Sequence, residues 1–97
     1  MKLRISDEAL WDLQEISNYT WAQWGEEQEQ KYLDLMYRAL EQIADDSSRA
    51  RCRNDLYQGC RMLLAGKHAI FFMIQEDSVS VARILHQAMD YRSHLLP

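Results

Sequence analysis

Three strand-length apolar segments, separated by two short turns, limit what the second half of this chain can fold into. The segments are residues 60–65, 68–75 and 79–86, and the links are Gly66-Lys67 and Glu76-Asp77-Ser78. Links this short join antiparallel neighbours, because a parallel pair needs a crossover of a dozen residues or more. The pattern therefore predicts a three-stranded antiparallel β-meander over residues 60–86.

The middle and last of these segments are apolar on both alternating faces. In the middle segment one face carries Ile70, Phe72 and Ile74, and the other carries Ala69, Phe71 and Met73. In the last segment strict alternation groups Val79, Val81, Arg83 and Leu85 against Ala82, Ile84 and His86. An open antiparallel sheet usually has one wet face. Two interpretations stay open: a second polypeptide covers an apolar groove on the second face, or a C-terminal segment with Leu95 and Leu96 seals it.

The first 44 residues predict a strand followed by a helical hairpin. Leu3 and Ile5 alternate with polar neighbours, which is typical of a short half-buried strand. A helix is expected to begin at Ser6 or Asp7 and to end at Gly25, and a second helix to run from about Glu26 to Ala44. Since the link at Gly25 is short, we expect the two helices to pair antiparallel.

The remaining segments complete an α+β prediction. Residues 45–59 are expected to be irregular, and Asp90 to Leu96 to form a short C-terminal helix ended by Pro97. Arg49, Arg51 and Arg53 form either a solvated connector or a basic rim for an acidic partner. The predicted fold is one domain over residues 1–97: an N-terminal strand, an α-helical hairpin, a three-stranded antiparallel β-meander and a short C-terminal helix.

Composition and charge disfavour several classes of function. No run approaches the roughly 18 apolar residues of a membrane span, and polar residues follow the first four where a signal peptide would be apolar. We therefore expect a soluble cytoplasmic protein without membrane contact. The net charge of −4 disfavours direct nucleic-acid binding. Residues 49–97 nevertheless carry a net charge of +3, which favours an acidic partner.

The residues capable of chemistry form no recognised catalytic motif. His68, His86 and His94 are 18 and 8 residues apart, which is not metal-ligand spacing, so we expect neither a metal nor a cofactor. Cys52 and Cys60 do not form a CxxC pair and are expected to be free thiols. A further hypothesis places Arg61 and Arg83 on the same side of the sheet, where they would bind a carboxylate of a protein partner.

A series of short motifs nevertheless has a familiar order. The most specific block is Arg83-Ile84-Leu85-His86-Gln87-Ala88-Met89-Asp90, followed by His94-Leu95. Earlier motifs are Ala9, Asp12-Leu13, Ile16 and Tyr19, then Trp24-Gly25, Gln28 and Tyr32, then Leu56, Gly59 and Arg61, then His68 and Ile70-Phe71-Phe72. In order and spacing, over nearly the whole chain, they resemble the ParE toxins of bacterial toxin–antitoxin modules, within the RelE/ParE superfamily.

The resemblance implies a function and two partners. A ParE toxin is neutralised by a ParD-like antitoxin whose C-terminal segment wraps around it, and its target is DNA gyrase, held in a state that blocks replication. Such a toxin binds its target and is not itself an enzyme. The surface expected to bind antitoxin or target comprises Arg61, Arg83, His86, Met89 and Asp90. Two of these residues also have an alternative structural role: Met89 could simply pack, and Asp90 could cap the last helix.

Two alternative functions stay open on the same scaffold. A RelE-like ribosome-dependent mRNA endonuclease would use Arg61, Arg83 and Tyr91 around the sheet, although the acidic pI of about 5.2 disfavours contact with a polyanion. A degenerate toxin would bind its antitoxin alone and serve as a co-repressor.

Overall fold

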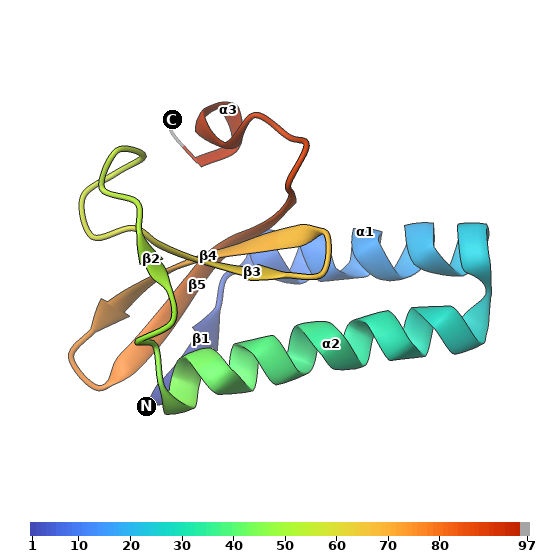
Figure 1. The fold of residues 1–97 in the computed structure, drawn as a ribbon, viewed down its shortest axis with the longest axis horizontal. Helices are drawn as coiled ribbons and strands as arrows, with labels where there is room; N and C mark the ends of the chain where they lie inside the picture. Colours follow the sequence, from blue (N-terminus) through green and yellow to red (C-terminus); the bar gives the residue numbers. More distant parts are fainter. Residues whose placement is uncertain (96–97) are drawn as a thin grey trace.

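The computed structural model describes residues 1–95, in which a helical hairpin packs on one face of a β-sheet (Figure 1). The elements are β1 (Lys2–Ile5), α1 (Asp7–Trp24), α2 (Glu26–Asp45), β2 (Arg51–Cys52), β3 (Arg61–Ala65), β4 (His68–Gln75), β5 (Ser78–His86) and α3 (Tyr91–Leu95). Within the described residues the strand order is β1-β5-β4-β3-β2, with β1 parallel to β5 and the other neighbours antiparallel. The predicted α+β fold is thus confirmed. Leu96 and Pro97, which the sequence placed at the end of the last helix, lie outside the described residues.

The hairpin has local causes at both ends of α1. The Ser6 Oγ accepts a hydrogen bond from the backbone N–H of Ala9 at 3.0 Å, which caps the helix, and Asp7 and Glu8 favour its positive N-terminal end. Gly25 ends α1 and begins α2 with a φ of 91°, a conformation that side-chain-bearing residues rarely adopt. The two helices therefore lie antiparallel with a single residue between them (Figure 1).

The segment predicted to be irregular contains one short strand. Residues Arg51 and Cys52 of β2 pair with β3 at the edge of the sheet. A two-residue strand with both side chains exposed has no apolar pattern, so the sequence could not reveal it. Arg53 Nε lies 2.9 Å from the Asp55 carboxylate, and its guanidinium carbon lies 5.8 Å from the centre of the Tyr91 ring. The Arg53 guanidinium therefore has partners within the chain itself.

A β-bulge in β5 changes which residues share a face. The register pairs Phe72 with Val81 but Phe71 with Arg83, so Ala82 is an extra residue on β5. The Ala82 carbonyl accepts a hydrogen bond from the Ser6 Oγ at 2.7 Å, which ties the start of α1 to the bulge. As a result Ile84 joins Val79 and Val81 in the core under the hairpin, and strict alternation along β5 was wrong beyond Val81.

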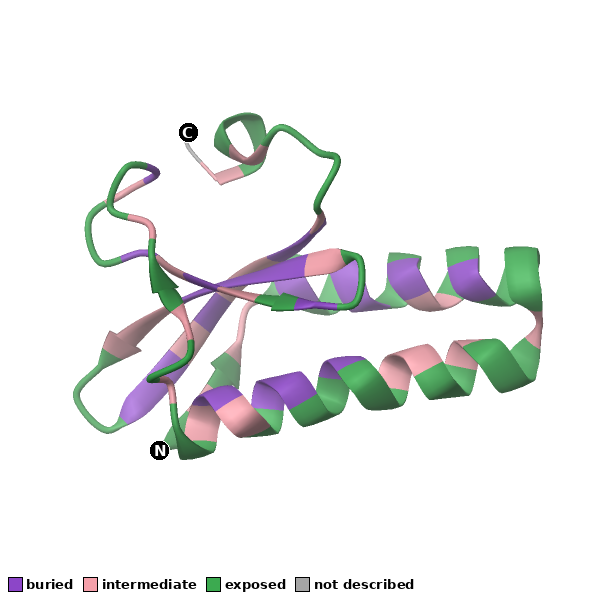
Figure 2. Ribbon diagram, viewed as in Figure 1, coloured by how far each residue is buried: buried purple, intermediate pink, exposed green. Residues whose placement is uncertain are grey.

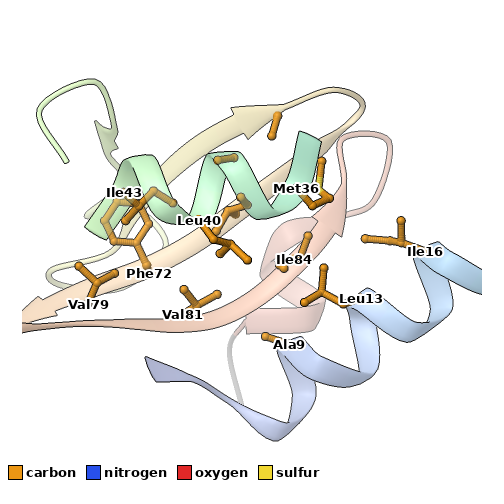
Figure 3. Packing of buried hydrophobic residues seen from close by; sticks show 13 residues of the cluster. Ala9, Leu13, Ile16, Met36, Leu40, Ile43, Phe72, Val79, Val81 and Ile84 are labelled. Carbon is orange, nitrogen blue, oxygen red and sulfur yellow. The ribbon is translucent and has the colours of Figure 1, made fainter. Parts of the chain in front are cut away.

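The main core lies between the hairpin and the sheet (Figure 3). Its helical part presents one side of each helix, coloured purple in Figure 2. The helices contribute Ala9, Leu13, Ile16, Met36, Ala39, Leu40 and Ile43, and the strands contribute Ala65, Ile70, Phe72, Val79, Val81 and Ile84. Burial of these side chains supplies most of the hydrophobic stabilisation that holds the two layers together. No helix within residues 1–95 is both long enough and apolar enough to cross a bilayer.

A second, smaller core lies on the other face of the sheet. Its buried members are Leu56, Cys60, Met62, Ala69, Phe71 and Leu85. The connector before β3 covers them together with α3, whose Tyr91 ring lies 4.9 Å from the Phe71 ring in an edge-to-face contact. Phe71 is 0% exposed. Of the two interpretations left open by the sequence, an open apolar groove on this face is therefore wrong: the connector and the C-terminal segment with Leu95 cover the face.

Candidate functional site

The exposed apolar surface lies beside the hairpin rather than on the second face of the sheet. A groove of about 960 Å³ runs along α1 and is closed on its other side by the β3–β4 turn, the C-terminal end of β5 and the segment toward α3. Large side chains stand open along it: Trp11 is 61% exposed, Tyr19 65%, Trp24 69% and Met89 46%. Single exposed apolar residues are ordinary, but a cluster of aromatic residues in a hollow marks an interaction site.

An ion pair joins α1 to β5 at the floor of the groove. The Asp12 carboxylate accepts hydrogen bonds from Nε and Nη2 of Arg83, each at 2.9 Å, and from the backbone N–H of Ile84 at 2.9 Å. The Asp12 side chain is 5% exposed and that of Arg83 is 20% exposed. These hydrogen bonds raise the pKa of Arg83. The Nη1 of Arg83 also donates to the His94 carbonyl at 3.3 Å, so Arg83 fastens α1, β5 and α3 together.

A Tyr–His–His cluster forms the opposite wall of the groove. Tyr32 Oη accepts a hydrogen bond from the backbone N–H of Lys67 at 2.9 Å and lies 2.6 Å from Nδ1 of His68. The His68 and His86 rings meet edge to face, 5.3 Å between centres, because the two residues are cross-strand neighbours. Burial lowers the pKa of His68 to about 4, and the nearby His86 adds to this effect.

Gly66 makes this arrangement possible. Its φ is +57°, and a Cβ at that position would lie 2.8 Å from Tyr32 Oη. A larger residue would therefore push the β3–β4 turn away from α2.

The structure brings three of the five predicted site residues into the groove. Arg83, His86 and Met89 line it. Asp90 instead lies just before α3, where its carboxylate accepts the backbone N–H of Arg92 at 3.2 Å, which is a capping contact.

Arg61 lies elsewhere in the sheet. The register pairs Arg61 with Phe72 and Arg83 with Phe71, and the two phenylalanines belong to different cores. Residues paired across an antiparallel ladder share a face, so the arginines lie on opposite faces. The hypothesis that Arg61 and Arg83 bind one carboxylate together is therefore wrong.

Sequence reasoning missed the Asp12 carboxylate as a site residue, although one clue was available. Asp12 stands on the buried side of α1 between Ala9, Leu13 and Ile16, where a lone acidic residue needs a partner. The exposed aromatic residues gave no such clue, because exposure depends on what the sheet and its loops leave uncovered.

The other candidate chemistry in residues 1–95 is sparse. No group of three or more His, Cys, Asp or Glu side chains there is arranged to hold a metal ion. Cys52 is exposed, Cys60 is buried, and both are free thiols, as predicted. Burial raises the pKa of the Cys60 thiol, which makes it a poorer nucleophile.

Comparison with known proteins gives one consistent result. Residues 3–91 match the family described as ParE toxin of the type II toxin–antitoxin system, parDE. Toxin ParE1 of Mycobacterium tuberculosis is 33% identical over 92 residues, covering 94% of both chains, and Toxin ParE1 of Caulobacter vibrioides is 33% identical over 92 residues, covering 95% of both.

A solved structure described as a chromosomal ParDE TA system from P. aeruginosa has the same fold. Its TM-score is 0.78 at 18% identity, covering 89% of this chain and 95% of that one. The family match and the two relatives extend over almost the whole chain. The chain belongs to the ParE toxin family of type II toxin–antitoxin systems.

Proposed function

We propose that this ParE-family chain binds a ParD-like antitoxin in the groove beside α1, and that the free toxin inhibits DNA gyrase and blocks replication by binding alone. The exposed aromatic cluster in the groove carries the first part of the proposal. Trp, Tyr and Met are enriched at the centres of protein interfaces, where each buries a large apolar area. The gyrase target and cytoplasmic action rest on membership of the family.

The shape of the groove suits a polypeptide segment. It is an open channel along an 18-residue helix, and its lining mixes apolar side chains with polar and charged ones. An amphipathic helix binds such a channel through apolar residues at every third or fourth position. An antitoxin segment of this kind would cover Trp11, Tyr19 and Trp24 at once.

The positions of three residues favour a binding function over ribonuclease activity. Arg61 and Arg83 lie on opposite faces of the sheet, and Asp12 already holds Arg83 in a two-pronged ion pair. The ring of Tyr91 packs against Phe71 in the second core. The set that an mRNA endonuclease would need is thus dispersed, and the net charge of −4 does not attract RNA.

A matched pair of tryptophans tests the antitoxin site. Trp11 lines the groove, whereas Trp21 does not, although both lie on α1 with exposures of 61% and 59%. Trp11→Ala is expected to weaken binding of the antitoxin encoded beside the toxin by about 30-fold or more, the effect of losing roughly 2 kcal/mol at a central aromatic contact. Trp21→Ala should leave the affinity within about threefold. Equal effects in calorimetry would place the antitoxin elsewhere.

Two parallel assays test the target. The purified chain is added to a gyrase supercoiling reaction and to translating ribosomes programmed with a defined message. We expect loss of supercoiling or trapped cleaved DNA in the first, reversed by antitoxin, and intact message in the second. Cleaved message with normal gyrase activity would instead support the endonuclease. Tight antitoxin binding with neither effect would support the co-repressor.

A further inference from the structure

We infer that His68 and His86 form a paired hydrogen-bond donor site in the groove, and that this site binds the carboxylate of an acidic side chain on the antitoxin segment. The inference rests on the proposed antitoxin function and adds the chemistry by which one wall of the groove would select its partner. Three observations carry it: the tautomer of each ring, the accessibility of the two Nε2 atoms, and the charge beside the pair.

The tautomer of His86 is fixed by the backbone. Its Nδ1 accepts a hydrogen bond from the backbone N–H of Ala88 at 3.0 Å. A backbone N–H can only donate, so Nδ1 carries no proton. The neutral ring must therefore carry its proton on Nε2.

We assign the tautomer of His68 from its contact with Tyr32. Tyr32 Oη accepts the backbone N–H of Lys67 at 2.9 Å, and among the described residues the acceptor within reach of its own hydroxyl proton is His68 Nδ1, at 2.6 Å. Burial raises the pKa of the Tyr32 hydroxyl, so this proton is retained and donated. His68 therefore also carries its proton on Nε2, and protonation of Nδ1 is opposed.

Both Nε2–H groups are open to the groove. Within residues 1–95 the hydrogen bonds of the two rings are those made by their Nδ1 atoms, and no buried side-chain nitrogen or oxygen there lacks a partner. Each Nε2 is therefore reached by solvent rather than enclosed. Both residues line the groove, so we infer that these solvent-accessible donors are available to a segment bound in it.

A carboxylate meets the requirements of this pair better than a metal ion does. Its two oxygens can accept from two neighbouring N–H donors, and the ammonium of Lys67, one residue from His68, adds positive charge. Arg83, the other cationic side chain that lines the groove, is already paired with Asp12. A metal on His86 Nε2 would need the ring proton on Nδ1, where it would face the N–H of Ala88.

Substitutions at His86 test the inference by antitoxin affinity. His86→Phe keeps the ring shape and removes the donor, and is expected to weaken binding about 10- to 100-fold, the range for a hydrogen bond to a charged group. His86→Gln places an amide N–H near the position of Nε2 and is expected to restore binding to within about fivefold of wild type. Both variants are first checked for unchanged unfolding midpoints.

A double-mutant cycle identifies the carboxylate. Each Asp or Glu of the antitoxin segment is replaced by Asn or Gln in turn; one replacement is expected to weaken binding to the wild-type toxin by a clearly larger factor than it weakens binding to His86→Phe, which keeps the His68 donor. Wild-type affinity in His86→Phe would overturn the inference. If Trp11→Ala still weakened binding, the groove would remain the proposed antitoxin site without the histidine pair. Loss of binding on adding EDTA would overturn it in favour of a metal. Absence of binding by the wild type would overturn both the inference and the proposed function.

Discussion

Asp12 is expected to be the most sensitive polar position in the fold. Its carboxylate is 5% exposed and receives three hydrogen bonds, two from the guanidinium of Arg83 and one from the backbone N–H of Ile84. Asp12→Ala would leave that N–H buried without an acceptor, which costs about 1–3 kcal/mol, and would leave the arginine charge unpaired. Because Arg83 is itself 20% exposed and can turn toward the groove, we expect a total loss of about 3 kcal/mol rather than the ~5 kcal/mol of a fully buried pair.

Graded substitutions separate the two contributions. Asp12→Asn keeps an oxygen for the Ile84 N–H and should lose about half as much as Asp12→Ala. Arg83→Met keeps the apolar stem and removes the charge. Since the two side chains bind each other directly, we expect the double variant Asp12→Ala, Arg83→Met to lose about 2 kcal/mol less than the sum of the single losses.

Urea unfolding measures these losses. The free energy of unfolding is extrapolated from transitions followed by tryptophan fluorescence and circular dichroism, with coincidence of the two as the check for two-state behaviour. Glu15→Ala is the control, because Glu15 is an exposed carboxylate one turn further along α1, and we expect a change within about 0.5 kcal/mol. A loss below about 1 kcal/mol for Asp12→Ala, or additive effects in the cycle, would refute the reasoning.

Three other substitutions or conditions probe the remaining parts of the structure. The pKa of His68 is lowered from 6.5 to about 4, so between these pH values the unfolded chain binds a proton that the folded chain does not. The free energy of unfolding should therefore be highest above pH 6.5 and fall by about 1–2 kcal/mol as the pH drops toward 4. Urea titrations at a series of pH values across that range measure the free energy of unfolding, which should depend less steeply on pH for His68→Gln than for the wild type. Tyr32→Phe removes the acceptor of the Lys67 N–H and should lower the free energy of unfolding by about 1–2 kcal/mol, whereas an unchanged midpoint would argue against that hydrogen bond. Phe71→Ala empties the second core and should cost about 3–5 kcal/mol, with faster amide exchange at Tyr91; unchanged exchange there would mean that α3 is held by other contacts.

The candidate site could be predicted from the sequence only in part. Arg83, His86 and Met89 were named from the C-terminal motif, and the structure places all three in the groove. Asp12 and Tyr32 were not assigned to a site, because each acts on a residue far away in the sequence, Arg83 and His68 respectively. A contact between distant segments leaves no spacing in the chain from which it can be read.

The elements themselves were determined locally. Apolar residues at spacings of three and four, a Ser cap, and Gly25 between the two helices are enough to predict the hairpin, and alternation with short turns is enough to predict the meander. The motifs also identified the family, because their order along the chain is itself a property of the sequence.

Only the tertiary structure decided which surfaces are covered. The bulge at Ala82 moves Ile84 into one core and Leu85 into the other, and nothing in the residue type of Ala82 marks it. The connector and α3 then fold over Phe71, so the apolar surface left for a partner lies along α1 and not on the sheet. Periodicity fixes which residues share a side of an element, but burial depends on which other segment packs there, and that is settled by contacts between residues distant in the chain.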